Sequence, residues 1–77
     1  MQVKVRILGA VDKPMGKDAF EVEVPEGATI EQVLLASGYR KEHLKWFLVA
    51  RNGEDCKLVT AVAAGDEVSV VFPTSGG

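Results

Sequence analysis

The sequence predicts an α+β fold in which a sheet of short strands packs against one helix. Three observations predict it. Apolar and polar residues alternate at 3–7 and again at 20–24, which is the period of a half-buried strand. Residues 30–37 instead repeat their apolar side chains at helical spacing. Finally, Asn52-Gly53 follows an apolar run, a pair typical of a tight β-hairpin.

The first two strands are predicted at 3–7 and 20–24. Glycine, aspartate and proline gather in the connection between them, as expected of a loop. The second strand ends at Pro25. Two strands joined by one loop most simply form an antiparallel hairpin.

The helix is predicted to begin after Thr29, which has a capping partner in Gln32 three residues later. Gly38 stands where a helix ends in a left-handed residue. About nine or ten residues of helix result, enough to cover one face of a sheet. Its buried face is predicted from the series Ile30, Val33, Leu34 and Ser37.

Three further strands are predicted at 46–51, 56–59 and 68–72. Asn52-Gly53 turns the first into the second, and residues 63–67 form the turn before the third. Pro73 ends the last strand because proline has no N–H for a sheet ladder. Trp46 and Phe47 are neighbours in a strand, so they face opposite ways. One is predicted in the core, and the other is either covered by a loop or exposed to a partner.

Composition predicts one small cytoplasmic domain. The chain has 77 residues, of which 47% are hydrophobic, so it has a core but a modest one. With a net charge of −2 and scattered basic residues, the protein is not expected to have a positive electrostatic field that attracts nucleic acid or anionic lipid. A single cysteine excludes an internal disulfide and fits a reducing compartment. No apolar run approaches the roughly 20 residues that cross a bilayer.

The sequence offers no catalytic residue, metal site or bound cofactor. His43 is the single histidine and is interpreted as a surface residue, since no partner residue is in place to orient it. No Cys/His cluster has zinc-ligand spacing. Cys56 follows Glu54 and Asp55, whose charges raise a thiol pKa and lower its reactivity. That acidic pair is interpreted as a solvated turn.

The last fifteen residues combine a Gly65-Asp66-Glu67-Val68 turn, a strand end at Phe72-Pro73 and a terminal Gly76-Gly77. This combination resembles the ubiquitin-like sulfur-carrier family, which includes the small subunit of molybdopterin synthase (MoaD) and the thiamine sulfur carrier (ThiS). The resemblance implies a β-grasp fold, a mixed sheet of four to five strands with one helix on one face. It implies a single domain at 1–73 and a flexible tail at 74–77.

The resemblance also implies a function without catalytic side chains. A ubiquitin-activating-type adenylyltransferase would use ATP to adenylate the carboxylate of Gly77. Sulfur would then replace AMP to give a thiocarboxylate, and the large catalytic subunit of a sulfur-transfer enzyme would use it on a cofactor precursor. Gly76 lacks a β-carbon and so fits a narrow channel. Thr74 and Ser75 keep the tail hydrated, and Pro73 stiffens its root.

Ordering such a tail costs roughly 4–8 kcal/mol of backbone entropy, so a docking patch on the domain is expected to offset it. The sheet face away from the helix offers three candidates, although a place in the core fits each of them nearly as well. They are Leu8, Phe47 and Val71.

Four functions remain open, with a MoaD-like carrier favoured by the long 9–17 connection. A thiamine-type carrier is the first alternative, because the run to "VARNGE" resembles that branch and Thr74 replaces a frequent proline. A protein modifier joined to lysines through Gly77 is the second. A β-grasp interaction module whose diglycine has no chemical role is the third.

Overall fold

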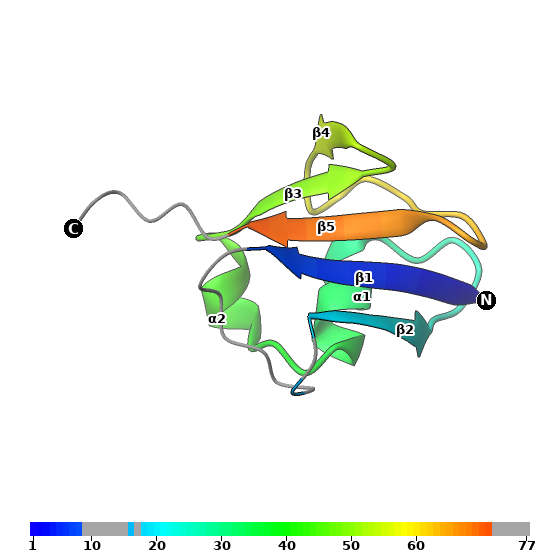
Figure 1. Ribbon diagram of the computed structural model, residues 1–77, viewed down its shortest axis with the longest axis horizontal. Helices are drawn as coiled ribbons and strands as arrows, with labels where there is room; N and C mark the ends of the chain where they lie inside the picture. The colour runs from blue at the N-terminus through cyan, green and yellow to red at the C-terminus, as the bar shows by residue number, and fades with distance from the viewer. Residues whose placement is uncertain (9–15, 17, 72–77) are drawn as a thin grey trace.

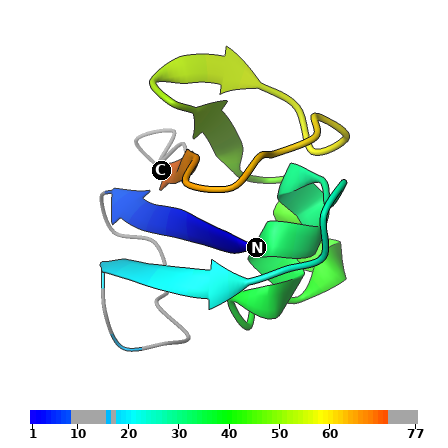
Figure 2. The same cartoon turned by 90° about the vertical axis from the view of Figure 1, so that its right-hand side faces the viewer.

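A computed structural model describes residues 1–8, 16 and 18–71. Five strands form one sheet in the order β2-β1-β5-β3-β4, and two helices cover one of its faces (Figures 1 and 2). The predicted α+β class with a mixed sheet is confirmed, because β1 and β5 are parallel while the other neighbours are antiparallel. The elements are β1 (Gln2–Leu8), β2 (Ala19–Glu23), α1 (Ile30–Ala36), α2 (Lys41–Leu44), β3 (Leu48–Arg51), β4 (Glu54–Cys56) and β5 (Glu67–Val71).

The predicted antiparallel hairpin of the first two strands is confirmed. β1 pairs with β2 from Gln2↔Glu23 to Arg6↔Ala19. Its residues alternate strictly between exposed and buried, as the sequence pattern requires. One face of the sheet is therefore apolar and the other largely polar.

The core fills the space between that apolar face and the helices. β1 and β5 at the centre of the sheet supply fully buried valines, and α1 meets them with its own apolar face. Ser37 is buried among them because its hydroxyl donates a hydrogen bond to the Val33 carbonyl at 2.8 Å. The largest fully buried side chains are Ile30, Leu34, Leu44, Val3, Val5, Val33, Val68 and Val70.

α1 begins with the predicted capping box. Thr29 Oγ1 accepts from the Gln32 backbone N–H at 3.4 Å, and Gln32 Oε1 accepts from the Thr29 N–H at 2.8 Å. Gly38 follows the helix with φ 100°, the left-handed geometry that glycine adopts without a steric penalty. Both ends of α1 thus have the local stabilisation that the sequence predicts.

Thr29→Ala should lower the free energy of unfolding by about 1 kcal/mol, because it removes the cap acceptor. For a domain of this size, that corresponds to roughly 4–8 °C in Tm. Thr29→Ser is the matched control, since it keeps the hydroxyl and should keep most of the stability. Equal melting curves for the two variants would contradict a stabilising role for the cap.

α2 is an addition to the predicted elements. It has four residues, its N-cap Arg40 makes no side-chain capping hydrogen bond, and only Leu44 is buried. β3 consequently begins at Leu48 rather than at the predicted residue 46. No helix in the described part of the chain is long and apolar enough to cross a membrane.

The β3–β4 hairpin forms at Asn52-Gly53, as predicted, but its second strand lies earlier than expected. Asn52 and Gly53 have φ 52° and 85°, the pair of positive values that a two-residue type I′ turn needs. Arg51 is therefore opposite Glu54, and pairing ends at Cys56. The predicted strand at 56–59 was wrong for this reason, because such a turn starts the return strand at once.

Candidate functional site

The predicted reactive end of the chain, Gly77 with Gly76, lies outside the described residues. So do the tail residues Thr74 and Ser75, the strand end at Pro73, and the division between a domain at 1–73 and its tail. The described structure does include β5 up to Val71. The surface around Val71 is therefore the part of the candidate site that can be examined directly.

Three apolar residues lie side by side at this end of the sheet. Val71 is paired with Leu8 of β1 on one side and with Leu48 of β3 on the other. We call Leu8, Val71 and Leu48 the apolar row. Together they line a shallow hollow of about 310 Å³ on the face of the sheet away from the helices. Leu8 is 41% exposed and Leu48 is 60% exposed.

The apolar row includes two of the three predicted docking residues. The placement of Phe47 on this face was wrong. Its ring packs against the core and makes an edge contact with buried Tyr39, with ring centroids 4.9 Å apart. Inward-facing Val49 sets the alternation of β3, so Leu48 faces outward instead. The sequence analysis missed Leu48. The alternation of side chains along the strand indicates it, because Leu48 is next to inward-facing Val49.

A buried carboxylate fixes the hairpin that carries Leu48. Asp66 is 8% exposed and accepts hydrogen bonds from Arg51 Nε at 2.6 Å, Asn52 Nδ2 at 3.0 Å and the Ala63 N–H at 2.7 Å. The Asn52 side chain also accepts from the Glu67 N–H at 2.9 Å. Asp66 thereby ties the turn before β5 to the β3–β4 hairpin.

These contacts change the titration of Asp66. The Asn52 amide first, then the Ala63 N–H, hold the pKa of its carboxyl below the ordinary aspartate value, with Arg51 acting in the same direction against the effect of burial. A lowered folded-state pKa contributes stability that is present above the unfolded value, about pH 4, and lost as pH falls through the folded value.

Asp66→Asn should therefore cost about 2 kcal/mol of unfolding free energy at pH 7, since it weakens charge-assisted hydrogen bonds. Below about pH 4 the difference from the parent protein should shrink, because the parent carboxylate also protonates there. Urea unfolding at pH 7 and at pH 3 measures both values. A constant difference between the two proteins would contradict this role of the charge.

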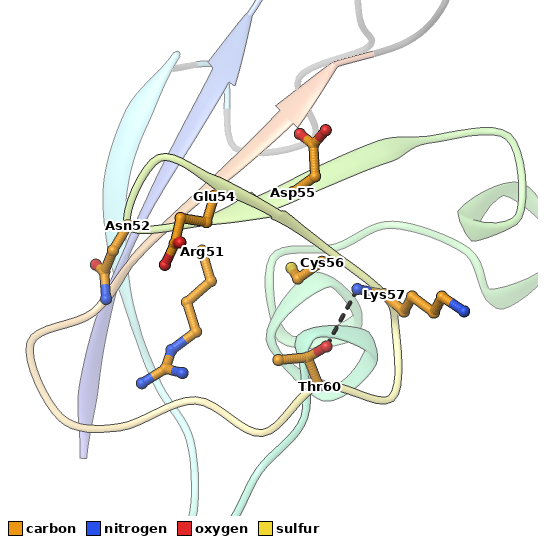
Figure 3. A pocket seen from close by; sticks show the side chains of 7 residues that line it. All are labelled: Arg51, Asn52, Glu54, Asp55, Cys56, Lys57 and Thr60. Atoms are coloured by element: carbon orange, nitrogen blue, oxygen red, sulfur yellow. Dashed lines mark hydrogen bonds between the residues drawn. The ribbon is translucent and has the colours of Figure 1, made fainter.

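A polar hollow of about 480 Å³ lies over the same hairpin, lined by Arg51, Asn52, Glu54, Asp55, Cys56, Lys57 and Thr60 (Figure 3). The Asp55 carboxylate points away from the Cys56 thiol in this view. Burial is the main factor that raises the pKa of Cys56, while Thr60 and Arg51 lower it and Asp55 adds to the rise. The predicted direction is confirmed, but its main cause is burial rather than acidic neighbours. A thiol with a raised pKa is a poor nucleophile.

The other residues considered for chemistry are exposed, as the sequence analysis predicted. His43 lies on α2, and Glu54 and Asp55 lie on β4 rather than in the predicted turn. Trp46 is 56% exposed while Phe47 packs inward, so the two rings do face opposite ways. Among residues 1–8, 16 and 18–71, no group of three His, Cys, Asp or Glu residues could hold a metal ion.

A mixed sheet with a helix across one face, an apolar row at the end of its last strand, and a diglycine sequence beyond it are typical of a ubiquitin-like β-grasp protein. The model of the ThiS family matches residues 5–77. The chain belongs to the ThiS family, a family of small sulfur carriers. Comparison with curated proteins gave no significant match.

The similar solved structures include a small archaeal modifier protein and a putative subunit of a molybdopterin converting factor. SAMP1 from Haloferax volcanii has 27% identity and a TM-score of 0.79, with all of both chains covered. A putative molybdopterin converting factor, subunit 1, from Pyrococcus furiosus has 26% identity and a TM-score of 0.72, covering 95% of this chain and 98% of that one.

A third similar structure is a complex of subunits 1 and 2 of the molybdopterin-converting factor from Helicobacter pylori. It has 23% identity and a TM-score of 0.64, and all of both chains is covered. At this identity the likeness concerns the fold alone. The β-grasp prediction is confirmed by all three structures.

Proposed function

We propose that this protein carries sulfur as a thiocarboxylate on Gly77 and donates it in cofactor biosynthesis, with a molybdopterin-type pathway favoured. The observation that supports the proposal most is the family match through residue 77, which includes the terminal diglycine. In this proposal the protein is a co-substrate and supplies no catalytic side chain.

The chemistry follows from the weak electrophilicity of a carboxylate, which is ionised at neutral pH. The Gly77 carboxylate attacks the α-phosphorus of ATP in the active site of an adenylyltransferase, and pyrophosphate leaves. A cysteine persulfide then attacks the acyl carbon and AMP leaves. A thiol reductant cleaves the resulting acyl disulfide, so that one sulfur stays on Gly77 as the thiocarboxylate.

The apolar row is proposed as the docking surface that holds the carrier while its tail is ordered. Burying one leucine-sized side chain contributes about 1.5–3 kcal/mol. The exposed fractions of Leu8 and Leu48, 41% and 60%, add up to about one such side chain, so their burial offsets part of the roughly 4–8 kcal/mol needed to order four tail residues. Leu8 and Leu48 are exposed enough to make this contribution.

The molybdopterin-type assignment rests on likeness to subunit 1 of the molybdopterin converting factor. It implies a large catalytic subunit as the second partner, by analogy with the two-subunit complex. The ThiS family match keeps a thiamine-type pathway as the alternative.

A protein modifier is the second candidate function, and likeness to SAMP1 at 27% identity favours it. Both functions use the same adenylate. They differ in the nucleophile that follows it, a persulfide sulfur for the carrier and a lysine amine for the modifier.

Deletion of the gene in its own host tests the proposal. We expect molybdopterin content to fall, and to recover with the full chain but not with a chain that lacks Gly77. A thiamine requirement instead would support the thiamine-type alternative. Loss of lysine conjugates with unchanged content of both cofactors would support the modifier.

A further inference from the structure

A second hollow lies between α2 and the β3–β4 hairpin and shares Asp55, Cys56 and Lys57 with the polar hollow over the hairpin. Its volume is about 340 Å³, near the lower end of the roughly 300–1,000 Å³ of ligand clefts. Its lining is mainly apolar, with Leu44, Phe47 and Leu58 among the side chains, and Leu48 is shared with the apolar row. We call it the α2 hollow. Its size suits one bulky apolar side chain.

Charged side chains also contribute to the lining of the α2 hollow. Lys45 and Lys57 both line the α2 hollow and are exposed, with Asp55 as the one acidic residue in its lining. Lys45 Nζ also lies 5.3 Å from the centre of the Trp46 ring. An exposed aromatic ring beside a cation is a frequent feature of protein-binding surfaces.

The local charge is opposite to that of the rest of the protein. Residues 40–46 contain three basic residues and one acidic residue, and Lys57 and Asp55 add one of each. These make four of the nine basic residues but only two of the eleven acidic ones, so the region has a net charge of +2. The remainder, with five basic and nine acidic residues, has a net charge of −4.

We infer that the α2 hollow binds an acidic peptide segment of a partner protein, with one bulky apolar side chain inserted between Lys45 and Lys57. The apolar part of the lining binds the bulky side chain of the peptide. The two lysines attract the acidic residues on either side of it through charge complementarity. The inference goes beyond the sulfur-carrier function, because it holds whether Gly77 receives sulfur or a lysine amine.

Single-stranded nucleic acid is the rival occupant, because a base would stack on Trp46 and lysines attract phosphates. The hollow favours a peptide, since its lining is mainly apolar and suits an apolar side chain better than a phosphate backbone. Asp55 in the lining and a remainder with net charge −4 also oppose a polyanion.

Binding of a synthetic peptide tests the inference. The probe is the capped heptapeptide Asp-Glu-Asp-Phe-Asp-Glu-Asp, with a central-leucine version beside it. The controls replace the central residue by serine or all six acids by lysine. Trp46 is the single tryptophan, so its fluorescence reports binding next to the hollow, and amide shifts in NMR spectra locate the peptide.

We expect saturable binding of the phenylalanine or leucine probe, shifts at Lys45, Leu48 and Leu58, and weaker binding at high salt. Lys45→Glu with Lys57→Glu should weaken it by about tenfold or more. Lys4→Glu with Arg6→Glu, exposed on β1, makes the same charge change elsewhere and should leave the affinity within about twofold.

Several results would overturn the inference. These are no saturable binding of either acidic probe, equal binding of the serine control, or equal weakening by both charge-reversal pairs. Tighter binding of an oligothymidylate to the same residues would assign the surface to nucleic acid. Concentration-dependent shifts without peptide would assign it to a second copy of the chain.

Discussion

Removal of Gly76 and Gly77 should abolish adenylation while the domain stays folded. Every residue of the described core lies at or before Val70, so truncation should change the free energy of unfolding by less than about 0.5 kcal/mol. The reaction should nonetheless stop, because in the proposed mechanism the nucleophile toward ATP is the Gly77 carboxylate. ATP–pyrophosphate exchange with the host's activating enzyme measures the loss, and thermal melting measures the fold.

A chain with one alanine added after Gly77 is a second variant, and it tests whether the position of the terminal carboxylate matters. It keeps both glycines but moves the carboxylate by one residue and adds a β-carbon, and exchange should again fall to background. Exchange by either variant at the parental rate would contradict a role for Gly77 in activation.

Leu48→Asp should lower kcat/KM for adenylation by about 100-fold, which corresponds to about 2.7 kcal/mol. The apolar contact is lost, and a buried carboxylate without a partner adds a desolvation penalty. Leu48 is 60% exposed in the free protein, so the cost to stability should stay within about 1 kcal/mol. Steady-state kinetics and melting of the same preparation separate the two effects.

Val59→Asp makes the same change at an apolar residue that is still more exposed and lies outside the apolar row. It should leave kcat/KM within about twofold, since most surface substitutions away from an interface have small effects. Equal losses at Leu48 and Val59 would show that charge in general, rather than the apolar row, governs docking.

The elements of the fold that depend on local patterns were predictable from the sequence. β1 alternates because only one face of the sheet is covered, and α1 has a capping box that four residues suffice to recognise. The Asn52-Gly53 turn likewise has a local signature. The central β1–β5 parallel pair joins distant parts of the chain, so no local pattern predicted it, and the resemblance implied only that the sheet is mixed.

α2 could not be predicted, because four residues without a capping side chain leave almost no periodic signal. Its presence delays β3 to Leu48 and turns Phe47 toward Tyr39. The misplacement of Phe47 on the outer face does not depend on α2, because Phe47 and buried Val49 fall on the same face of the predicted strand at 46–51. Val49 is paired with buried Val70 and faces the core. Because side chains alternate along a strand, its neighbour Leu48 is the residue that faces outward.

The role of Asp66 also exceeded what the sequence could reveal. The Gly65-Asp66-Glu67 turn was recognised as a motif, but its partners Arg51 and Asn52 are 14 or 15 residues away along the chain. Tertiary structure alone brings a buried carboxylate to the hairpin turn. Among the described residues, the hydrogen bonds from Arg51 and Asn52 to Asp66 connect the Gly65-Asp66-Glu67 turn to the hairpin that carries Leu48.

The intact mass of the protein after incubation with the host's activating enzyme, ATP and a sulfur donor tests the central claim most directly. We predict a rise equal to the replacement of one oxygen by sulfur, absent from the chain without Gly77 and reversed when a sulfur acceptor is added. A parent mass that stays unchanged under conditions that consume ATP, or adducts joined only to lysines, would contradict a sulfur carrier.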